Sequence, residues 1–521
     1  MLSGKIITDI GKPSFSIYSA HESYVEIGSL ETEEVYAHFV TEKDASKTSI
    51  SSAYWGQTAS PQKYAAIKKE ILDWSLQSLV IERSKKDDRV TVQRNHQAEC
   101  GLYLLAKQNT LYLHWDPVEL YQHINTSSDF LDIGATLSRL ELDLRYSAHT
   151  PFKDIFRLLE RGIAVFANQE LTIQKPDHID PPQAVPLKSG VDAVSVFHDL
   201  VRNAISRWPI IPDQTASILS SGLDTTIVAC LLGQALGDHK LKTFGYNCLD
   251  KYRAEINAMR QETIEKLDLL DHHPRVEELF HQAYNLNNTY LRWPMESQTT
   301  FLEQGLAHLM SQEGVTLAFT GIGGDELCML SPRERAEMKL PENRTSAGDD
   351  NHSHDGFSLL VPKFKDYTIS SKEMDWPNGY IGYSAPDMAN ATGLPYLRKG
   401  IWYAHPLANA EIQMFTNFLP KEYRYRRRLS REALSRLGWS EFFVKQTPKE
   451  GLTGTITTVL YNIDWDSIFK ESVLFDYGFI DRQSLFAGIE LFKKTLSVNV
   501  GVKILMTLEL EMGLKSLMKQ K

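Results

Sequence analysis

The chain has 521 residues, of which 42% are hydrophobic and 23% charged, and this length exceeds what one ordinary hydrophobic core accommodates. The formal net charge of -10 argues against binding to a nucleic-acid backbone, because proteins that do so usually carry a basic surface. The four cysteines are widely spaced and form no CxxC pair, which predicts reduced thiols and neither a disulfide framework nor a zinc site. No window approaches the roughly 20 apolar residues of a membrane span and the N-terminus lacks a signal-peptide core, so we expect a cytoplasmic protein without membrane contact.

Short alternating segments dominate the first 175 or so residues and predict antiparallel strands. They are YVEIGSL (24–30), CGLYLLA (100–106), NTLYLHW (109–115) and AVFANQELTIQ (164–174). The stretch SPQKYAAIKKEILDWSLQSLVIE (60–82) predicts a helix between them. Four prolines in KPDHIDPPQAVPLKSG (175–190) predict an interdomain linker. The predicted division is therefore a first domain at 1–178, a linker at 179–190 and a second domain at 191–521.

Beyond the linker, helical and strand-like segments alternate, which is typical of an α/β domain with a parallel sheet. The stretch 191–208 has Val194, Phe197, Val201 and Ala204 at helical spacing. Three apolar segments predict strands: ASILS (216–220), LKTFGYN (241–247) and VTLAFTG (315–321). The polar stretch 341–357 predicts a surface insertion, and residues from 375 onward predict mostly helices.

A hydroxyl-rich turn, SSGLDTT (220–226), lies between the first of these strands and a predicted helix at 226–236. Ligands bind at such turns in open α/β folds, and the first turn of a helix favours an anion such as a phosphate chain. Gly222 would let the backbone turn tightly and approach the ligand. The hydroxyl donors are Ser220, Ser221, Thr225 and Thr226. Asp224 suits an anion site only with a cation between them, which predicts Mg²⁺. The alternative is that Asp224 caps the helix and the serines are ordinary turn residues.

A second stretch, LAFTGIGGDELC (317–328), has the same organisation of an apolar strand followed by glycines and an acid. Gly321 and Gly323 would allow backbone amides to approach a ligand, and Asp325 would be the second Mg²⁺ ligand. The alternative is a glycine turn followed by a helix with an acidic first turn. Two such turns, each after a buried strand, favour the ligand-binding interpretation.

At these residues the chain resembles the asparagine synthetase superfamily, whose PP-loop ATP pyrophosphatase domain carries an S-G-G-x-D-S turn and a later G-x-G-x-D-E turn. Here they stand at 220–225 and 321–326. Similar segments follow in HPLANAEIQMFTNFLP (405–420), YRRRLSREALSRLGW (425–439) and VKQTPKEG (444–451). The resemblance implies an N-terminal degenerate glutaminase-like domain of the Ntn-type αββα fold and a C-terminal parallel-sheet synthetase domain.

The resemblance also implies a two-step reaction. A substrate carboxylate attacks the α-phosphate of ATP, pyrophosphate leaves, and an amine attacks the resulting acyl-adenylate to release AMP. The first turn would hold the pyrophosphate, and Asp224 and Asp325 would hold Mg²⁺. Lys445, by its distance from Gly451, matches the family's catalytic lysine, and Lys449 is a competing candidate. The alternative for either lysine is a solvated surface residue. The arginines at 424 and 426–428 are interpreted as a mainly solvated face and receive no role.

The chain departs from glutamine-dependent members, which carry a cysteine nucleophile at position 2, where this sequence has Leu2. The amine is therefore expected from a substrate. Two groups of relatives lack that cysteine: β-lactam and carbapenam synthetases, and lasso-peptide macrolactam synthetases. The first group has a proton-transferring Tyr where this chain has Ile322, and DMANATGLPYLRKGIWYAHPL (387–407) is more similar to the second.

We therefore expect macrolactam formation in a ribosomal precursor peptide, with a protease or a leader-peptide-binding protein as a partner. Two alternatives remain open: an amide ligase or cyclase of a small amino-acid-derived precursor, which the loop at 444–455 also resembles, and a non-catalytic relative.

Overall fold

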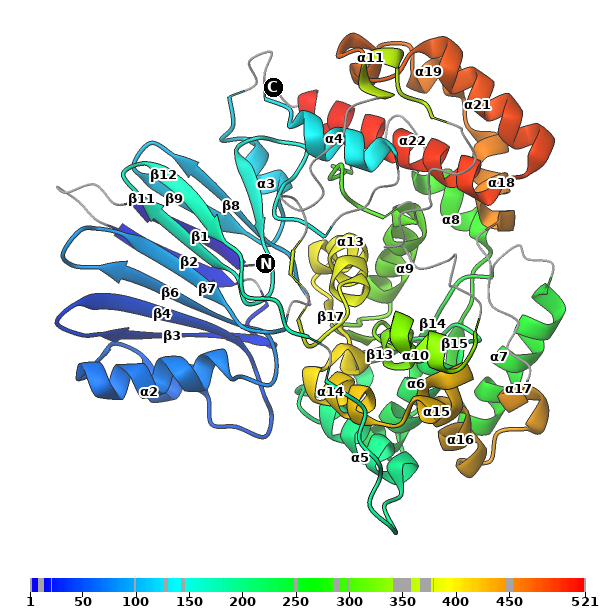
Figure 1. Ribbon diagram of the computed structural model, residues 1–521, viewed down its shortest axis with the longest axis horizontal. Coiled ribbons are helices and arrows are strands. Elements are labelled where there is room, and N and C mark those ends of the chain that lie inside the picture. The colour runs from blue at the N-terminus through cyan, green and yellow to red at the C-terminus, as the bar shows by residue number, and fades with distance from the viewer. Residues whose placement is uncertain are drawn as a thin grey trace.

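The computed structural model describes a β-rich N-terminal region and an α/β C-terminal region (Figure 1). The described residues are all except 1, 8–13, 20, 98–99, 126–129, 142–145, 181, 248–251, 284–289, 298, 341–357, 366–375, 378, 446–452 and 520–521. The predicted insertion at 341–357 thus lies outside the described residues. Of the helices in the described part, none combines the length and the apolar character needed to cross a membrane.

Two sheets form the N-terminal region, and their strands pair antiparallel except where β3 meets β5. The first sheet has the order β10 (Ile155–Leu158), β8 (Leu102–Lys107), β9 (Thr110–His114), β1 (Leu2–Ile7) and β2 (Ser14–Ser19). The second has the order β12 (Glu170–Gln174), β11 (Ile163–Ala167), β7 (Val90–Arg94), β6 (Ser78–Ser84), β4 (Val35–Glu42), β3 (Val25–Glu31) and β5 (Gln57–Thr58). The four segments predicted as strands are therefore confirmed.

Alternating side chains place these sheets in a layered stack. On β8, Leu102 and Leu104 belong to the core shared with the second sheet, whereas Tyr103 and Leu105 belong to a core on the opposite face. Helices cover both outer faces: α2 (Pro61–Leu72) on the second sheet, and α3 (Val118–Tyr121) and α4 (Ile133–Leu140) on the first. This helix–sheet–sheet–helix order agrees with an αββα arrangement, while the relation to glutaminases stays a prediction.

The helix predicted over 60–82 is wrong in its second half. The helix α2 begins after the N-cap Ser60 and ends at Leu72, and the strand β6 begins at Ser78. The apolar run in β6 is buried on both faces of its sheet, so helical periodicity cannot distinguish it from a helix. A short helix, α1 (Ile50–Tyr54), also precedes α2.

A five-stranded parallel sheet forms the centre of the C-terminal region, as predicted (Figure 1). Its order is β15 (Leu270–His272), β14 (Lys242–Phe244), β13 (Thr215–Ile218), β16 (Leu317–Phe319) and β17 (Trp402–Ala404). The three predicted strands are β13, β14 and β16. The chain runs outward from β13 to β14 and β15 and then crosses to β16 and β17. The strand order therefore reverses between β13 and β16, and ligands bind at such a switch point in open parallel sheets.

Helices surround this sheet and form most of the chain after residue 375, as predicted, except for β17. The helix α5 buries the four apolar residues that predicted it. The helices before residue 375 are α5 (Ala193–Ile205), α6 (Leu223–Leu236), α7 (Arg253–Leu267), α8 (Val276–Ala283), α9 (Thr300–Gln312), α10 (Pro332–Glu337) and α11 (Pro362–Lys365). Those after it are α13 (Ser384–Arg398), α14 (Ala410–Phe418), α15 (Lys421–Arg424), α16 (Arg428–Arg436), α17 (Glu441–Lys445), α18 (Thr453–Asn462), α19 (Trp465–Ile468), α20 (Val473–Asp476), α21 (Arg482–Thr495) and α22 (Val498–Met518).

The segment between the two regions follows the surface of the second. Residues 175–192 contain no helix or strand in their described part, and the Val185 N–H donates to the Phe418 carbonyl at 2.9 Å. Polar contacts also join the regions directly. The Tyr24 hydroxyl lies 2.6 Å from Thr316 Oγ1, and the Arg398 guanidinium donates to both oxygens of Asp116 at 2.6 and 2.8 Å.

Candidate functional site

The two predicted turns lie side by side at the switch point. Ser217 on β13 pairs with Phe319 on β16, so each strand delivers its turn to the same edge of the sheet. A Cβ at Gly321 would lie 2.9 Å from the Thr225 backbone nitrogen, and one at Gly324 would lie 2.2 Å from Asp224 Cγ. The second turn therefore packs directly on the first turn of α6, and these glycines are needed because a side chain would collide with it.

Gly323 meets a different constraint. Its φ is +98°, a conformation that non-glycine residues rarely adopt, and a Cβ there would lie 2.4 Å from the Ala408 backbone nitrogen. Glycine is thus required at Gly323 by backbone conformation and by packing against the segment after β17. The predicted use of these glycines in approaching a ligand remains a prediction, because their observed close contacts are to the protein.

The helix α6 begins at Leu223, three residues earlier than predicted, with Gly222 as its N-cap. Gly222 has a φ of -81°, which any residue can adopt, so the conformation of this turn does not itself require glycine, and the predicted approach of Gly222 to a ligand stays a prediction. Asp224 lies inside the first helical turn, and the alternative that it caps the helix is not supported. The carboxylate of Asp224 and the first-turn amides of α6 therefore share one end of the helix.

Two of the predicted hydroxyls brace the first turn. Ser220 Oγ lies 3.0 Å from Thr225 Oγ1, and the Ser220 N–H donates to the same Thr225 oxygen at 3.2 Å. The Gly222 N–H donates to Ser220 Oγ at 3.1 Å. These contacts fix the loop between β13 and α6 and hold both hydroxyls at the helix end.

The other two hydroxyls point elsewhere. Ser221 Oγ donates to the Ile256 carbonyl on α7 at 2.7 Å, and Thr226 Oγ1 donates to the Gly222 carbonyl at 2.9 Å. Both side chains are buried. The structure thus brings Ser220 and Thr225 together and directs the Ser221 and Thr226 hydroxyls into the protein, while phosphate binding by any of the four stays a prediction.

A buried arginine on α7, which sequence reasoning missed, supports the end of β13. The Arg260 guanidinium donates to the Leu219 carbonyl and to both oxygens of Asp271, the latter at 2.6 and 3.1 Å. Asp271 lies on β15, so this side chain connects the outer strand to the residue just before the first turn. No local pattern around Arg260 signals this role.

The two predicted metal ligands converge on one cation, the guanidinium of Arg427. Arg427 Nη1 lies 2.6 Å from Asp224 Oδ2, and Arg427 Nη2 contacts Asp325 Oδ1. The Asp224 side chain is 15% exposed and the Asp325 side chain 63% exposed, so the shared charge sits at the mouth of the site. A positive group between two carboxylates shows that this position suits a cation.

The donor set is also appropriate for Mg²⁺ that arrives with phosphates. In the described part of the chain, no three His, Cys, Asp or Glu side chains gather where they would hold a metal ion by themselves. Mg²⁺ is typically bound by one or two carboxylates together with substrate phosphates and waters. Asp224 and Asp325 beside the N-terminus of α6 fit that pattern.

An unusual kink places Arg427 at the site. The 3₁₀ turn Tyr425–Arg427 precedes α16, and Arg426 and Arg427 have φ values of +51° and +55°. Consecutive left-handed conformations at non-glycine residues are rare and strained. Sequence reasoning gave Arg427 no role, because a run of arginines carries no signal that one of them leaves the helical path.

The neighbouring arginines have other partners. Arg424 is buried and donates to the Met329 carbonyl at 2.8 Å and to Glu334, and Arg428 donates to Glu432 at 2.5 Å. The Arg426 guanidinium lies 5.3 Å from the centre of the Tyr425 ring. Arg426 and Arg428 are exposed, as a solvated face predicts. The prediction is wrong for Arg424, which is buried, and for Arg427, which contacts the two aspartates.

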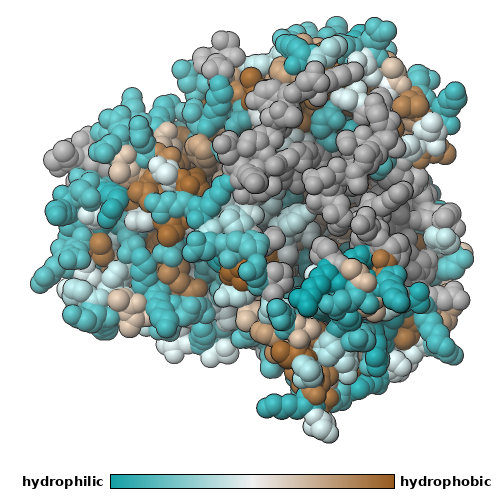
Figure 2. Space-filling view, in the orientation of Figure 1, coloured by the Kyte–Doolittle hydropathy of each residue, from teal (hydrophilic) through white to brown (hydrophobic). Residues whose placement is uncertain are grey.

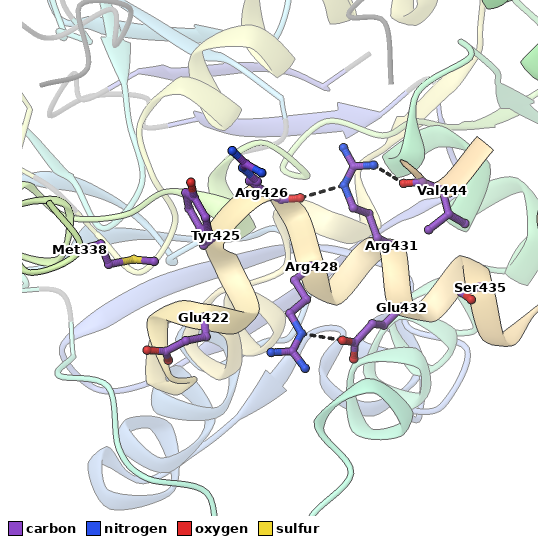
Figure 3. Close-up of a pocket in the computed structure, with 9 residues that line it drawn as sticks. All are labelled: Met338, Glu422, Tyr425, Arg426, Arg428, Arg431, Glu432, Ser435 and Val444. Carbon is purple, nitrogen blue, oxygen red and sulfur yellow. Dashed lines mark hydrogen bonds and ion pairs between the residues drawn. The ribbon is translucent and has the colours of Figure 1, made fainter. Parts of the chain in front are cut away.

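A cavity of about 450 Å³ lies beside the kink (Figure 3). Figure 2 shows strongly hydrophilic side chains over this part of the molecule, where α10 and α15 lie in Figure 1. The cavity is lined by Met338, Glu422, Tyr425, Arg426, Arg428, Arg431, Glu432, Ser435 and Val444. Within it, Arg431 donates to the Arg426 carbonyl at 2.8 Å and to the Val444 carbonyl, as Figure 3 shows. Arg431 therefore ties the kink to the end of α17.

The two candidate lysines, Lys445 and Lys449, come shortly after Val444 in the sequence. Lys445, the last residue of α17, forms an ion pair with Glu441, and its side chain is 71% exposed. The structure does not bring Lys445 into contact with the aspartates, although the carbonyl of the preceding residue, Val444, accepts a hydrogen bond from Arg431, which also bonds the Arg426 carbonyl. Lys449 lies outside the described residues. The catalytic assignment of either lysine stays a prediction.

The aspartates and glycine turns lie in a segment with a recognisable family signature. Residues 198–380 match the family model for asparagine synthase. The match supports the predicted placement in the asparagine synthetase superfamily, and it includes Asp224 and Asp325 but not Arg427 or the candidate lysines. No curated protein matches the chain.

Proposed function

We propose that this protein forms amide bonds at the expense of ATP, through an acyl-adenylate, with release of AMP and pyrophosphate. The observation that carries the proposal is the convergence of Asp224 and Asp325 on one cation at the switch point of a parallel sheet. The asparagine synthase match over 198–380 supports the reaction class, because members of that family are ATP-dependent amide-forming enzymes.

The chemistry follows from the arrangement of the first turn. The amides at the start of α6 and the Ser220–Thr225 hydroxyl pair would face the phosphate chain of ATP. Bound Mg²⁺ would supply charge neutralisation on the departing pyrophosphate. Asp224 and Asp325 would hold that ion, so both carboxylates act in the first step, the formation of the acyl-adenylate.

Replacing either carboxylate therefore tests the proposal. We expect Asp224→Asn and Asp325→Asn each to lower ATP–pyrophosphate exchange, measured with a candidate precursor peptide, and Asp224→Asn to do so by about a hundredfold or more, because several kcal/mol of charge stabilisation are lost. The loss should be smaller for Asp325, which is the more exposed ligand. Asp213→Asn, an exposed carboxylate at the opposite end of β13, is the control. Wild-type exchange in both test variants would refute the metal assignment.

The amine is proposed to come from the substrate and not from glutamine. Leu2 occupies the position of the cysteine nucleophile of glutamine-dependent relatives, and it is fully buried in β1, which pairs with β2 and β9 on its two sides. A buried leucine supplies neither a thiolate nor an accessible position for one.

The substrate is proposed to be a ribosomal precursor peptide that closes into a macrolactam. At the position where β-lactam synthetases carry a proton-transferring Tyr, the side chain of Ile322 packs against the apolar cluster that contains Ile381 and Ala385. An isoleucine side chain carries no group that moves a proton, which favours an amine nucleophilic enough to react without that base, such as a peptide N-terminus.

The lysine assignment and the product are tested together. We expect Lys445→Ala to bind nucleotide normally and to abolish the amide product, because an ammonium that stabilises the developing oxyanion is typically worth about 10²–10³ in rate. Mass spectrometry would measure the product as the precursor minus one water, with AMP formed in equal amount. Lys449→Ala is the matched comparison. If Lys449→Ala loses the product and Lys445→Ala keeps it, the roles of the two lysines are exchanged.

A further inference from the structure

We propose that the Arg427 guanidinium and the divalent cation compete for Asp224 and Asp325, so that metal binds tightly only together with nucleotide. This inference rests on the proposed function, since it assumes that the two aspartates are metal ligands. It adds an internal competitor to the site and predicts an order of binding.

The contacts at the site make competition unavoidable. One guanidinium reaches both carboxylates, through Nη1 to Asp224 Oδ2 at 2.6 Å and through Nη2 to Asp325 Oδ1. The planar fork of arginine matches two acceptors in fixed directions, and its charge persists at any physiological pH. A divalent ion that used these oxygens would meet that positive charge at contact distance, so the guanidinium must leave before the ion binds.

The two ion pairs of Arg427 do not oppose metal binding equally. The Asp224 side chain is 15% exposed and the Arg427 side chain 26% exposed, whereas Asp325 is 63% exposed. Ion pairs in full contact with water contribute little to binding or stability. The ion pair with Asp224 therefore contributes most of the energy with which Arg427 opposes metal binding. The contact with Asp325 mainly orients the Arg427 guanidinium.

The backbone holds the competitor in place. Arg426 and Arg427 both adopt left-handed conformations, and Arg431 Nε donates to the Arg426 carbonyl at 2.8 Å. Strain of this kind persists only where surrounding contacts enforce it. The same Arg431 guanidinium donates to the Val444 carbonyl, so the position of Arg427 is coupled to the end of α17.

Nucleotide would relieve the competition. A triphosphate at the N-terminus of α6 offers the guanidinium oxygen acceptors, and arginine binds phosphate by paired, charge-assisted hydrogen bonds. Transfer of Arg427 to the phosphates would free Asp224 and Asp325, which would then hold the metal. Metal and nucleotide should therefore bind with positive coupling, which is reciprocal.

The test measures Mn²⁺ binding by the loss of the free-ion EPR signal, with and without a non-hydrolysable ATP analogue. Without nucleotide, Arg427→Gln should bind Mn²⁺ about tenfold more tightly than the wild type, within the usual range of coupling between sites. The analogue should strengthen Mn²⁺ binding in the wild type and do so much less in Arg427→Gln. Arg428→Gln is the matched control, because Arg428 pairs with Glu432 and touches neither aspartate.

The outcomes separate this inference from the proposed function. Equal Mn²⁺ affinity in the wild type and Arg427→Gln, or an equal gain in Arg428→Gln, would overturn the competition. Asp224→Asn is then added to each variant. If it abolishes Mn²⁺ binding while Arg427→Gln changes nothing, only the present inference fails. If Mn²⁺ binding with nucleotide is indifferent to Asp224→Asn, the carboxylate is no metal ligand, and both proposals fail.

Discussion

Behind the second glycine turn, a line of buried polar side chains runs through the core. The Tyr396 hydroxyl donates to Glu303 Oε2 at 2.5 Å, and the Tyr396 ring stacks on Tyr403 at 4.2 Å. Tyr403 meets His405 edge to face, and His405 Nδ1 lies 2.7 Å from Thr320 Oγ1, immediately before Gly321. Burial lowers the pKa of His405 to about 3, so this imidazole is neutral and supports the turn without adding charge.

Glu303 makes stability depend on pH in a predictable direction. Burial raises the pKa of Glu303 from 4.5 to about 7, and the Tyr396 hydrogen bond opposes that shift only in part. The folded state therefore holds the proton more tightly than the unfolded chain. This contribution to the free energy of unfolding is complete below pH 4.5 and is lost as the pH rises through 7.

Glu303→Gln should remove this dependence, because the amide remains neutral. We expect the variant to be close to the wild type in thermal stability at pH 5 and more stable at pH 8, by up to about 3 kcal/mol. Thermal unfolding at several pH values measures the difference, and the exposed Glu313→Gln at the end of the same helix is the control. A constant difference between Glu303→Gln and the wild type from pH 5 to pH 8 would show that this carboxyl does not titrate as proposed.

At the scale of elements, the sequence predicted the two turns of the site but not the position of Arg427, whose guanidinium lies between the two aspartates. Apolar runs followed by glycines marked β13 and β16, because buried parallel strands are short and their turns need small residues. The strand β17 was missed, since three residues in a long helical region give too little pattern to detect. Arg427 was missed because its position depends on a kink at two left-handed arginines, which no helix propensity predicts.

The predicted boundaries of two elements were wrong for a related reason. The first turn of α6 contains Leu223, Asp224 and Thr225, residues that suit a loop as well as a helix start. The break between α2 and β6 lies at 73–77, inside a segment whose apolar residues fit the 3.6-residue period of a helix as well as the two-residue period of a strand. Local sequence thus located the sheet edge that holds the two turns, while packing against distant segments decided where each element begins.

For the molecule as a whole, Glu42 connects the two regions. This buried carboxylate at the end of β4 accepts the indole N–H groups of Trp208 at 3.1 Å and Trp402 at 2.5 Å, both from the C-terminal region. It also accepts the Gln77 N–H at 2.8 Å. Burial raises the pKa of Glu42, and these donors and Arg94 oppose that shift. Since Trp402 lies on β17, the contact reaches the sheet whose other strands deliver the two turns.

Removing the Glu42 carboxylate should lower the stability of the protein and weaken the contact between the N-terminal and C-terminal regions. Glu42→Ala leaves three buried donors without their acceptor, at about 1–3 kcal/mol each, so we expect the apparent Tm to fall by roughly 5 °C or more. Calorimetry should also show the single transition broaden or divide, because the two regions lose a shared contact. Glu42→Gln keeps one acceptor oxygen for the indoles and should be milder, and the exposed Glu33→Ala should resemble the wild type. If Glu42→Ala unfolds like Glu33→Ala, the two regions are held together by their apolar contacts and the indole contacts to Glu42 are dispensable.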